Sequence, residues 1–323
     1  MTILITGASG FVGRILAQHI HTIYPDTPLL LIDIETPLSP SPTPCDHIKC
    51  LSTDLTDPTS TSDLIKTHAP TLRTVYILHG IMSSASESNL SLGLSVNLDS
   101  IRHLLDSLHT HTPGIKVIFT SSCAVYGRSA VTNTATEATI TPFPESSYGT
   151  QKLMIEYLLN DYSRRGLLDG RIVRLPTIFV RSGKPTAAAS SFVSGIVREP
   201  VHGVESEVPV DPEIGIWLAS PRCLARNLVH AMEVEKVRFG SHRTVLLPGF
   251  TACSREILEC LEKVAGREVR ERVREKRDEG IERIVRSWPA RYDTSRAKEL
   301  GFYEDEGLEA AIREFVKGAK GEV

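Results

Sequence analysis

The sequence predicts an α/β fold in which a doubly wound parallel sheet is followed by a smaller C-terminal α+β part. Short apolar runs alternate with stretches of helical spacing up to about residue 175, which is typical of parallel strands joined by crossover helices. Beyond residue 177 this alternation decays. We therefore expect one domain over residues 1–177 and a second part over residues 178–323, with one return of the chain to the sheet.

Composition limits the classes of protein to consider. The 323 residues carry a net charge of -3 and 41% of them are apolar, which is ordinary for a soluble globular protein and predicts no nucleic-acid partner. No apolar run reaches the length of a membrane span, so we expect a cytoplasmic protein without a membrane partner. The six cysteines and eleven histidines show no metal-ligand spacing, which predicts reduced thiols and no metal. The sequence is compatible with a homodimer but does not determine the oligomeric state.

The first strand and the first helix meet at a glycine-rich turn. Residues 2–6 are typical of a strand buried on both faces, and residues 11–23 have helical spacing. Glycines let the backbone approach a phosphate, and the helix N-terminus adds free N–H groups and a partial positive charge. The spacing GxxGxxG differs from the commoner GxGxxG, and a plain strand-to-helix turn is the alternative interpretation. The cofactor-binding candidates here are Gly7, Gly10, Phe11, Val12 and Gly13.

An acidic residue ends the second predicted strand. Residues 29–32 are apolar, and Asp33 follows them. A carboxylate at this position can accept hydrogen bonds from an adenosine ribose, and its charge disfavours a 2′-phosphate. A surface aspartate without a ligand is the alternative. Together with the glycine turn, Asp33 predicts a dinucleotide cofactor, with NAD preferred over NADP.

The next segment combines a loop, a strand and a helix. Residues 36–44 contain alternate prolines and predict an exposed loop. Residues 48–51 predict the third strand, and residues 57–68 predict the helix after it. Asp54 and Leu55 follow the carboxyl end of this strand, where an adenine would lie. Both are therefore further cofactor-binding candidates.

Two more predicted strands bring small and polar residues to the same edge of the sheet. Residues 75–78 predict the fourth strand and residues 116–120 the fifth, with a long helix over residues 90–109 between them. Small residues follow the fourth strand and suit close approach of a cofactor. The candidates in this region are Leu78, Gly80 and Asn97 for the cofactor and Ser83 for the substrate.

A tyrosine and a lysine four residues apart begin the helix predicted over residues 148–165. Tyr148 and Lys152 fall on one face of this helix, so the ammonium can lie close to the phenol. A nearby cation favours the phenolate and lowers the tyrosine pKa, which makes the hydroxyl usable as a general acid/base. A chance pair on an amphipathic helix is the alternative interpretation.

The segments on either side of this helix complete the first domain. Residues 128–147 are rich in Thr, Pro and Ser and predict an excursion over the site. Residues 170–175 predict a sixth strand, closed by Pro176 and Thr177. The last cofactor-binding candidates along the chain are Tyr148, Lys152 and Thr177.

Four features follow one another along the chain: the glycine turn, the acidic strand end, the run Thr-Ser-Ser-Cys-Ala-Val-Tyr-Gly over residues 120–127 and the Tyr-x-x-x-Lys pair. In this order they resemble the extended short-chain dehydrogenases/reductases, the NAD-dependent epimerase/dehydratase family. The resemblance covers nearly the whole length and implies a Rossmann domain with a C-terminal substrate part. It also implies that Tyr148 is the acid/base, that Lys152 binds the nicotinamide ribose and that Ser122 orients the substrate hydroxyl. One departure is the run His-Gly-Ile at residues 79–81, where extended members often carry Ala-Ala.

Motifs in the second half resemble one branch of this family, the D-erythronate dehydrogenases. These motifs are Arg174-Leu175-Pro176-Thr177, the runs over residues 180–185 and 187–192, Ile196-Val197-Arg198-Glu199-Pro200, Trp217-Leu218-Ala219-Ser220-Pro221 and Ser287-Trp288-Pro289. The resemblance implies NAD-dependent oxidation of the C2 hydroxyl of a small sugar acid, D-erythronate, to a 2-oxo acid. A nucleotide-sugar epimerase or dehydratase on the same scaffold is the alternative function, and a non-catalytic dinucleotide-sensing protein is a third.

A small acid needs a cation for its carboxylate. Arg181 follows the Pro176-Thr177 turn and can hold a carboxylate by two parallel hydrogen bonds. A structural arginine at the joint between the two parts is the alternative interpretation. The substrate-binding candidates are Ser83, Ser122, Tyr148, Arg181 and Ser190.

Overall fold

A seven-stranded parallel sheet forms the centre of the computed structural model, which describes residues 1–127, 140–185 and 188–321. Every strand pair in this sheet is parallel. The strands in spatial order are β10 (Thr244–Leu246), β6 (Asp169–Leu175), β5 (Lys116–Ser122), β4 (Leu72–Ile77), β1 (Thr2–Thr6), β2 (Leu29–Asp33) and β3 (Ile48–Ser52). The predicted doubly wound α/β fold is confirmed.

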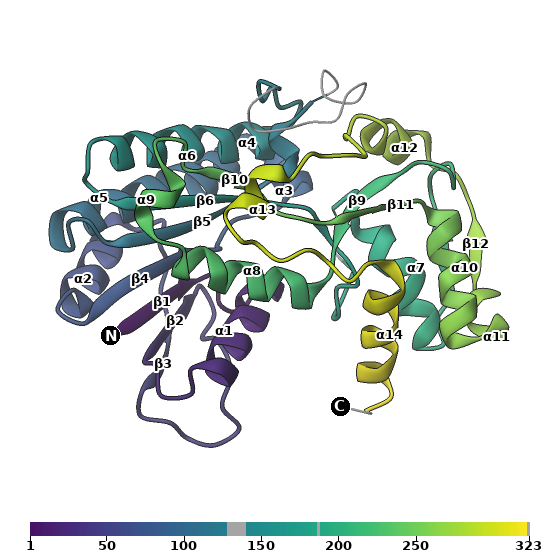
Figure 1. Ribbon diagram of the computed structural model, residues 1–323, viewed down its shortest axis with the longest axis horizontal. Coiled ribbons are helices and arrows are strands. Elements are labelled where there is room, and N and C mark those ends of the chain that lie inside the picture. Colours follow the sequence, from purple (N-terminus) through teal and green to yellow (C-terminus); the bar gives the residue numbers. More distant parts are fainter. Residues whose placement is uncertain (128–139, 186–187, 322–323) are drawn as a thin grey trace.

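Helices cover both faces of this sheet (Figure 1). Those of the described chain are α1 (Phe11–Ile23) and α8 (Pro221–Glu233) on one face, and α2 (Pro58–His68), α5 (Ser100–His111) and α6 (Ser147–Arg164) on the other. Residues of β1 alternate between two hydrophobic cores, because successive side chains of a strand point to opposite faces. Ile3 and Ile5 pack with α1 and α8, whereas Leu4 packs with α2, α5 and α6.

Two predicted elements differ from the observed ones. β4 begins at Leu72 and ends at Ile77, whereas the apolar run that predicted it starts only after the exposed Arg73. The helix predicted over residues 90–109 is divided into α4 (Leu90–Leu94), a π-helical turn (Ser95–Asp99) and α5. A π turn adds a residue to the helical repeat and therefore changes which side chains face inward.

The chain beyond β6 builds a smaller unit around a third hydrophobic core. Its strands are β7 (Thr177–Ile178), β9 (Ile216–Ala219) and β11 (Phe250–Ala252) in one sheet, and β8 (Ser206–Val208) and β12 (Val273–Glu275) in another. Its longer helices are α7 (Ser191–Val201), α10 (Ser254–Ala265) and α14 (Leu308–Ala319). The remaining α-helices of the described chain are α3 (Ser83–Ser88), α9 (Lys236–Phe239), α11 (Arg267–Arg270), α12 (Glu279–Val285) and α13 (Ser295–Glu299). A domain boundary at residue 177 stays a prediction.

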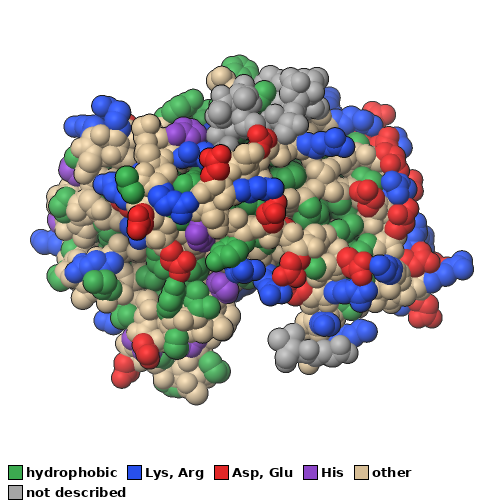
Figure 2. All heavy atoms as spheres, viewed as in Figure 1, with side chains coloured by type: hydrophobic (Ala, Val, Ile, Leu, Met, Phe, Trp, Pro, Cys, Tyr) green, Lys and Arg blue, Asp and Glu red, His purple; other side chains and the backbone are tan. Residues whose placement is uncertain are grey.

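Charges on the surface of the C-terminal unit are mixed. Figure 2 shows acidic and basic side chains interspersed there, and several form exposed ion pairs, among them Arg255 with Glu213 and Arg313 with Glu309. None of the helices in the described ranges combines the length and the apolar character that crossing a bilayer requires.

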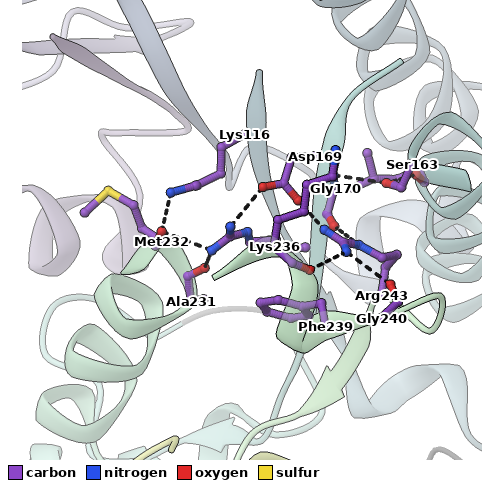
Figure 3. A network of polar contacts seen from close by, with 12 residues as sticks. Lys116, Ser163, Asp169, Gly170, Ala231, Met232, Lys236, Phe239, Gly240 and Arg243 are labelled. Atoms are coloured by element: carbon purple, nitrogen blue, oxygen red, sulfur yellow. Dashed lines mark hydrogen bonds and ion pairs between the residues drawn. The ribbon is translucent and has the colours of Figure 1, made fainter. Parts of the chain in front are cut away.

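A buried polar network fastens β10 and α8 to the sheet (Figure 3). Asp169, at the amino end of β6, forms ion pairs with Arg171 and Arg243. Arg171 and Lys116 also donate hydrogen bonds to the carbonyl of Met232, in the last turn of α8. Cations at a helix C-terminus satisfy its free carbonyls and interact favourably with the helix dipole. The network lies at the amino ends of the strands, the edge opposite the candidate site.

Candidate active site

The predicted site residues gather at the carboxyl ends of the parallel strands. The glycine turn follows β1, Asp33 ends β2, the residue 78–81 segment follows β4 and Ser122 ends β5. In the order β5-β4-β1-β2, the chain leaves β1 toward β2 on one side and leaves β4 toward β5 on the other side. In open α/β sheets a ligand binds at such a switch point, in the crevice beyond the carboxyl ends.

The glycine turn has no room for side chains. Gly7 has a positive φ of 68°, and a Cβ placed there would lie 2.6 Å from the backbone nitrogen of His79. A Cβ on Gly13 would lie 2.3 Å from the Gly7 carbonyl oxygen. Gly10 is the N-cap of α1 and offers no side chain to that helix, so N–H groups of the first turn stay available for an anion. These features fit the pyrophosphate of a dinucleotide.

Asp33 is held beside this turn. Its carboxylate accepts hydrogen bonds from the backbone N–H of Ser9 at 2.9 Å and of Ile34 at 2.8 Å. A carboxylate has about four acceptor positions, so it can still accept the two hydroxyls of a ribose. The bond to Ser9 fixes the distance between the turn and the end of β2, as a ligand that bridges them requires.

Tyr148 and Ser122 are hydrogen-bonded to each other. The Ser122 hydroxyl oxygen also accepts the N–H of Ala124 at 3.1 Å, in the 3-10 turn that follows β5. Ser122 therefore links Tyr148 to the turn that follows β5. Burial raises the pKa of Tyr148 to about 12, and the bond from Ser122 counteracts that rise because it stabilises the phenolate.

Lys152 is buried next to this pair. Its ammonium donates to the carbonyl of Thr120 at 3.0 Å and lies 4.7 Å from the centre of the Phe119 ring and 5.6 Å from that of Tyr148. Burial lowers the pKa of Lys152 to about 8. The expectation that Lys152 lowers the Tyr148 pKa is wrong for this structure, because the loss of water around the phenol outweighs other effects and only Ser122 opposes it.

Asn97 lies in the π-helical turn and points inward. Its amide oxygen accepts the N–H of Ile81 at 2.8 Å, and its NH₂ group lies 2.8 Å from the Gln151 side-chain oxygen and 3.0 Å from the Ser86 hydroxyl. Asn97 therefore clamps the segment after β4 to α6. A Cβ on Gly80 would approach the Asn97 oxygen to 2.8 Å, so the clamp also requires a glycine there. Direct binding of the cofactor by Asn97 stays a prediction.

His79, in the run that departs from the family pattern, bridges the end of β1 and the start of α5. Its Nδ1 lies 2.7 Å from the Thr6 hydroxyl and its Nε2 lies 3.0 Å from the Ser100 hydroxyl. Burial, together with the Lys152 ammonium, lowers the pKa of His79 to about 3. The ring is therefore neutral, and it adds no second positive charge beside Lys152.

The other cofactor candidates lie around the same crevice. Asp54 is exposed and accepts two hydrogen bonds from Thr56, whereas the Leu55 side chain belongs to a hydrophobic core. The N–H of Leu78 donates to the Thr6 hydroxyl at 3.2 Å. Phe11 and Val12 pack against the core beneath α1, and Thr177 pairs with Leu218 in the small sheet.

Arg181 is anchored through its backbone and not through its side chain. Its N–H donates to the Ser194 hydroxyl at 3.0 Å, and its carbonyl accepts from Arg198 at 2.9 Å. Within residues 1–127, 140–185 and 188–321 its guanidinium has no hydrogen bond or ion pair. Burial and the charge of Arg198 lower the Arg181 pKa. Such a group favours an anionic partner.

The remaining substrate candidates occupy two helix starts. Ser83 is the first residue of α3, and Ser190 is the N-cap of α7 without a side-chain bond to that helix. The predicted excursion falls mostly on residues 128–139, which lie outside the described residues.

Sequence reasoning missed a buried ion pair behind the site. Glu156 on α6 receives three hydrogen bonds from Arg174 on β6, at 2.6 Å, 2.9 Å and 3.2 Å, and one from the Ser121 hydroxyl. Arg174 also donates to the Tyr126 hydroxyl at 2.6 Å. Ser121 therefore faces away from the crevice, while Ser122 faces into it. The available signal was the spacing of Glu156, four residues after Lys152.

Comparison with known proteins gives consistent matches. The family model "NAD dependent epimerase/dehydratase family" matches residues 3–215. The chain is 38% identical to a D-erythronate dehydrogenase of Haemophilus influenzae over 98% of its length and 99% of that protein. It is 40% identical to a D-erythronate dehydrogenase of Cupriavidus necator over 99% of each.

A solved structure agrees with these matches. It is described as a nucleoside-diphosphate-sugar epimerase from Agrobacterium tumefaciens, and it superimposes with a TM-score of 0.91 at 34% identity, over 100% of this chain and 95% of that one. The predicted family and the predicted cofactor are confirmed. The chain therefore belongs to the NAD-dependent epimerase/dehydratase family, and it is an NAD-dependent enzyme.

Proposed function

We propose that this enzyme oxidises the C2 hydroxyl of a small sugar acid with NAD, and that the acid is D-erythronate, which becomes 2-oxo-tetronate. The observation that carries the proposal is the hydrogen-bonded pair Ser122 and Tyr148 with Lys152 beside it. The two D-erythronate dehydrogenases at 38% and 40% identity over nearly the whole chain support the choice of acid.

NAD, when bound, supplies the acceptor for the hydride that leaves C2. Gly7, Gly10, Gly13 and the first turn of α1 would hold its pyrophosphate, and Asp33 its adenosine ribose. The residues after β4 would border the nicotinamide half. The part of the chain after residue 177 would supply the contacts to the acid.

Tyr148 and Ser122 both act on the hydroxyl that is oxidised. Tyr148, as phenolate, accepts the proton of the C2 hydroxyl, while the C2–H bond breaks with its electron pair and a C2 carbonyl forms. Ser122 donates a hydrogen bond to the oxygen that reacts. Lys152 would donate a hydrogen bond to the nicotinamide ribose when NAD is bound.

Two other functions fit the same scaffold. A nucleotide-sugar epimerase returns the hydride to its substrate, and the structure from Agrobacterium tumefaciens is described as such an enzyme. A dinucleotide-sensing protein would need no acid/base, and the intact Ser122, Tyr148 and Lys152 argue against it.

Release of NADH separates these functions. We would incubate the enzyme with NAD and each of a panel of substrates: D-erythronate, other four- and five-carbon sugar acids, and nucleotide sugars. A dehydrogenase of D-erythronate gives one equivalent of NADH for each acid oxidised. Conversion of a nucleotide sugar without net NADH would instead establish the epimerase.

Cofactor choice follows from Asp33. The wild-type enzyme should prefer NAD to NADP, and Asp33→Ser should reduce this preference about ten- to a hundredfold, because it removes a repulsion of roughly 1.4–2.8 kcal/mol between the carboxylate and a 2′-phosphate. The measurement is kcat/KM with each cofactor. Asp26→Ser, at an exposed aspartate away from the strand ends, is the control. Equal turnover of the wild type with both cofactors would contradict the assignment.

Arg181 is the proposed partner of the substrate carboxylate. Arg181→Ala should raise KM for the acid about ten- to a hundredfold, since a charge-assisted hydrogen bond contributes about 1.5–3 kcal/mol, while the affinity for NAD stays the same. Arg222→Ala, at an exposed arginine of α8, is the matched control. An unchanged KM in a folded Arg181→Ala enzyme would mean that another residue binds the carboxylate.

A further inference from the structure

Three side chains of α6 form a line that leads from the site into the interior. Tyr148, Lys152 and Glu156 follow one another at intervals of four residues, so they share one face of the helix. The chemistry proposed above uses the first two. Glu156 is only 3% exposed, like Lys152, and its partners Ser121 and Arg174 are buried as well.

Glu156 connects two strands immediately before the catalytic serine. Ser121 and Arg174 are register partners on β5 and β6, and both donate hydrogen bonds to the Glu156 carboxylate. Ser122, the next residue of β5, carries the hydroxyl that is bonded to Tyr148. The carboxylate thereby fixes the strand end that presents Ser122 to the tyrosine.

The charge of Lys152 also depends on this carboxylate. β5 contributes to its surroundings the Thr120 carbonyl and the Phe119 ring, and α6 contributes Tyr148 and Glu156. His79, beyond β4, is neutral and adds no positive charge beside the ammonium. Burial lowers the Lys152 pKa to about 8, and Glu156 acts in the opposite direction. The carboxylate therefore helps to keep the ammonium at neutral pH.

We propose that Glu156 is a positioning residue of the site, which balances the buried Lys152 ammonium and holds the strand end that carries Ser122. Glu156 touches neither substrate nor cofactor and acts through these two residues. The inference rests on the proposed roles of Lys152 and Ser122. It does not depend on which acid is oxidised.

Binding of NADH as a function of pH tests the electrostatic half of the proposal. In the wild type, affinity should fall about five- to tenfold as pH rises through about 8, because a charged donor to the ribose becomes a neutral one. Glu156→Gln removes the negative charge and lowers the Lys152 pKa, so the fall should move to lower pH by about one unit. Glu156→Asp keeps the charge with a shorter side chain, and the fall should stay in place.

Controls distinguish this role from a purely structural one. Asp161→Asn removes a carboxylate from the same helix at an exposed ion pair and should leave the pH profile unchanged. A structural role predicts that Asp and Gln at residue 156 impair the enzyme through loss of the Arg174 geometry, with the pH midpoint of NADH binding unaltered. That result in a folded Glu156→Gln enzyme would overturn the proposal.

A second variant provides the same test if Glu156→Gln does not fold. The double variant Glu156→Gln, Arg174→Gln removes both members of the buried ion pair, so neither is left without its partner, and such neutral replacements are often tolerated. The same downward shift is expected, because Glu156 and not Arg174 affects the Lys152 pKa. An unshifted midpoint in the double variant would also refute the role. Because the readout is cofactor binding, inactivity towards D-erythronate would count against the proposed function and leave this test unaffected.

Discussion

Tyr148→Phe should lower kcat for oxidation of the acid by about a hundredfold to ten-thousandfold, which is the usual contribution of general acid/base catalysis. The substitution keeps the ring and removes the oxygen that accepts the C2 hydroxyl proton. NAD binding should change by less than about twofold, since the phenol oxygen is not among the groups proposed to hold the pyrophosphate or the adenosine ribose. Single-turnover formation of NADH and equilibrium binding of NAD measure the two quantities separately.

The pH dependence of the oxidation rate is a second measurement on the same variant. Oxidation needs the phenolate, and burial raises the Tyr148 pKa to about 12; the rate should therefore rise with pH. The rise should level off above about pH 8, where Lys152 loses its proton while the phenolate still becomes more abundant. The two groups are close, so the observed values belong to the pair. Tyr148→Phe should lack the rising limb.

A tyrosine elsewhere on the helix provides the matched control. Tyr157 lies on α6 with 62% of its surface exposed, and Tyr157→Phe should keep kcat and the pH profile of the wild type. Near-normal kcat in Tyr148→Phe, with the rising limb intact, would transfer the role of base to another group in the crevice.

Local sequence signals were sufficient for the first βα unit. The apolar run before Gly7 and the helical spacing after Gly10 predicted β1 and α1 with their observed ends. The position of Asp33 at the end of β2 was also correct. These features depend on neighbouring residues alone, because strand burial, turn geometry and helix periodicity each act over a few residues.

The pKa of Tyr148 could not be obtained in the same way. Spacing places Lys152 on the face that carries Tyr148, and the structure agrees. Spacing does not measure how much water the fold removes from the phenol. Burial dominates here, so a nearby ammonium is not enough to lower the pKa.

Contacts between distant segments were also beyond sequence reasoning. Glu156 on α6 forms an ion pair with Arg174 on β6, but in the sequence each residue looks like an ordinary surface charge. The inward direction of Asn97 depends on a π turn that a helical pattern conceals. Both features depend on packing in three dimensions, which hydrophobic periodicity does not encode.

The second large effect concerns stability. Asp169→Asn should lower the free energy of unfolding by about 3–5 kcal/mol, because it leaves Arg171 and Arg243 buried without their carboxylate. Figure 3 shows the Arg243 side chain beside Asp169. Asparagine is nearly the same size, so the effect reports the charge and not a cavity. Urea unfolding followed by circular dichroism measures it.

Activity and an exposed ion pair separate this effect from one on the site. Asp161→Asn breaks the exposed pair with Arg164 and should cost about 0–1 kcal/mol, as exposed pairs do. Asp169 lies at the amino ends of the strands and Ser122 at a carboxyl end, so folded Asp169→Asn enzyme should keep the wild-type kcat. A loss of stability no larger than that of Asp161→Asn would mean that the carbonyls around Arg171 and Arg243 suffice to hold both cations. In that case the attachment of α8 and β10 would depend on hydrophobic packing, and Asp169 would be dispensable.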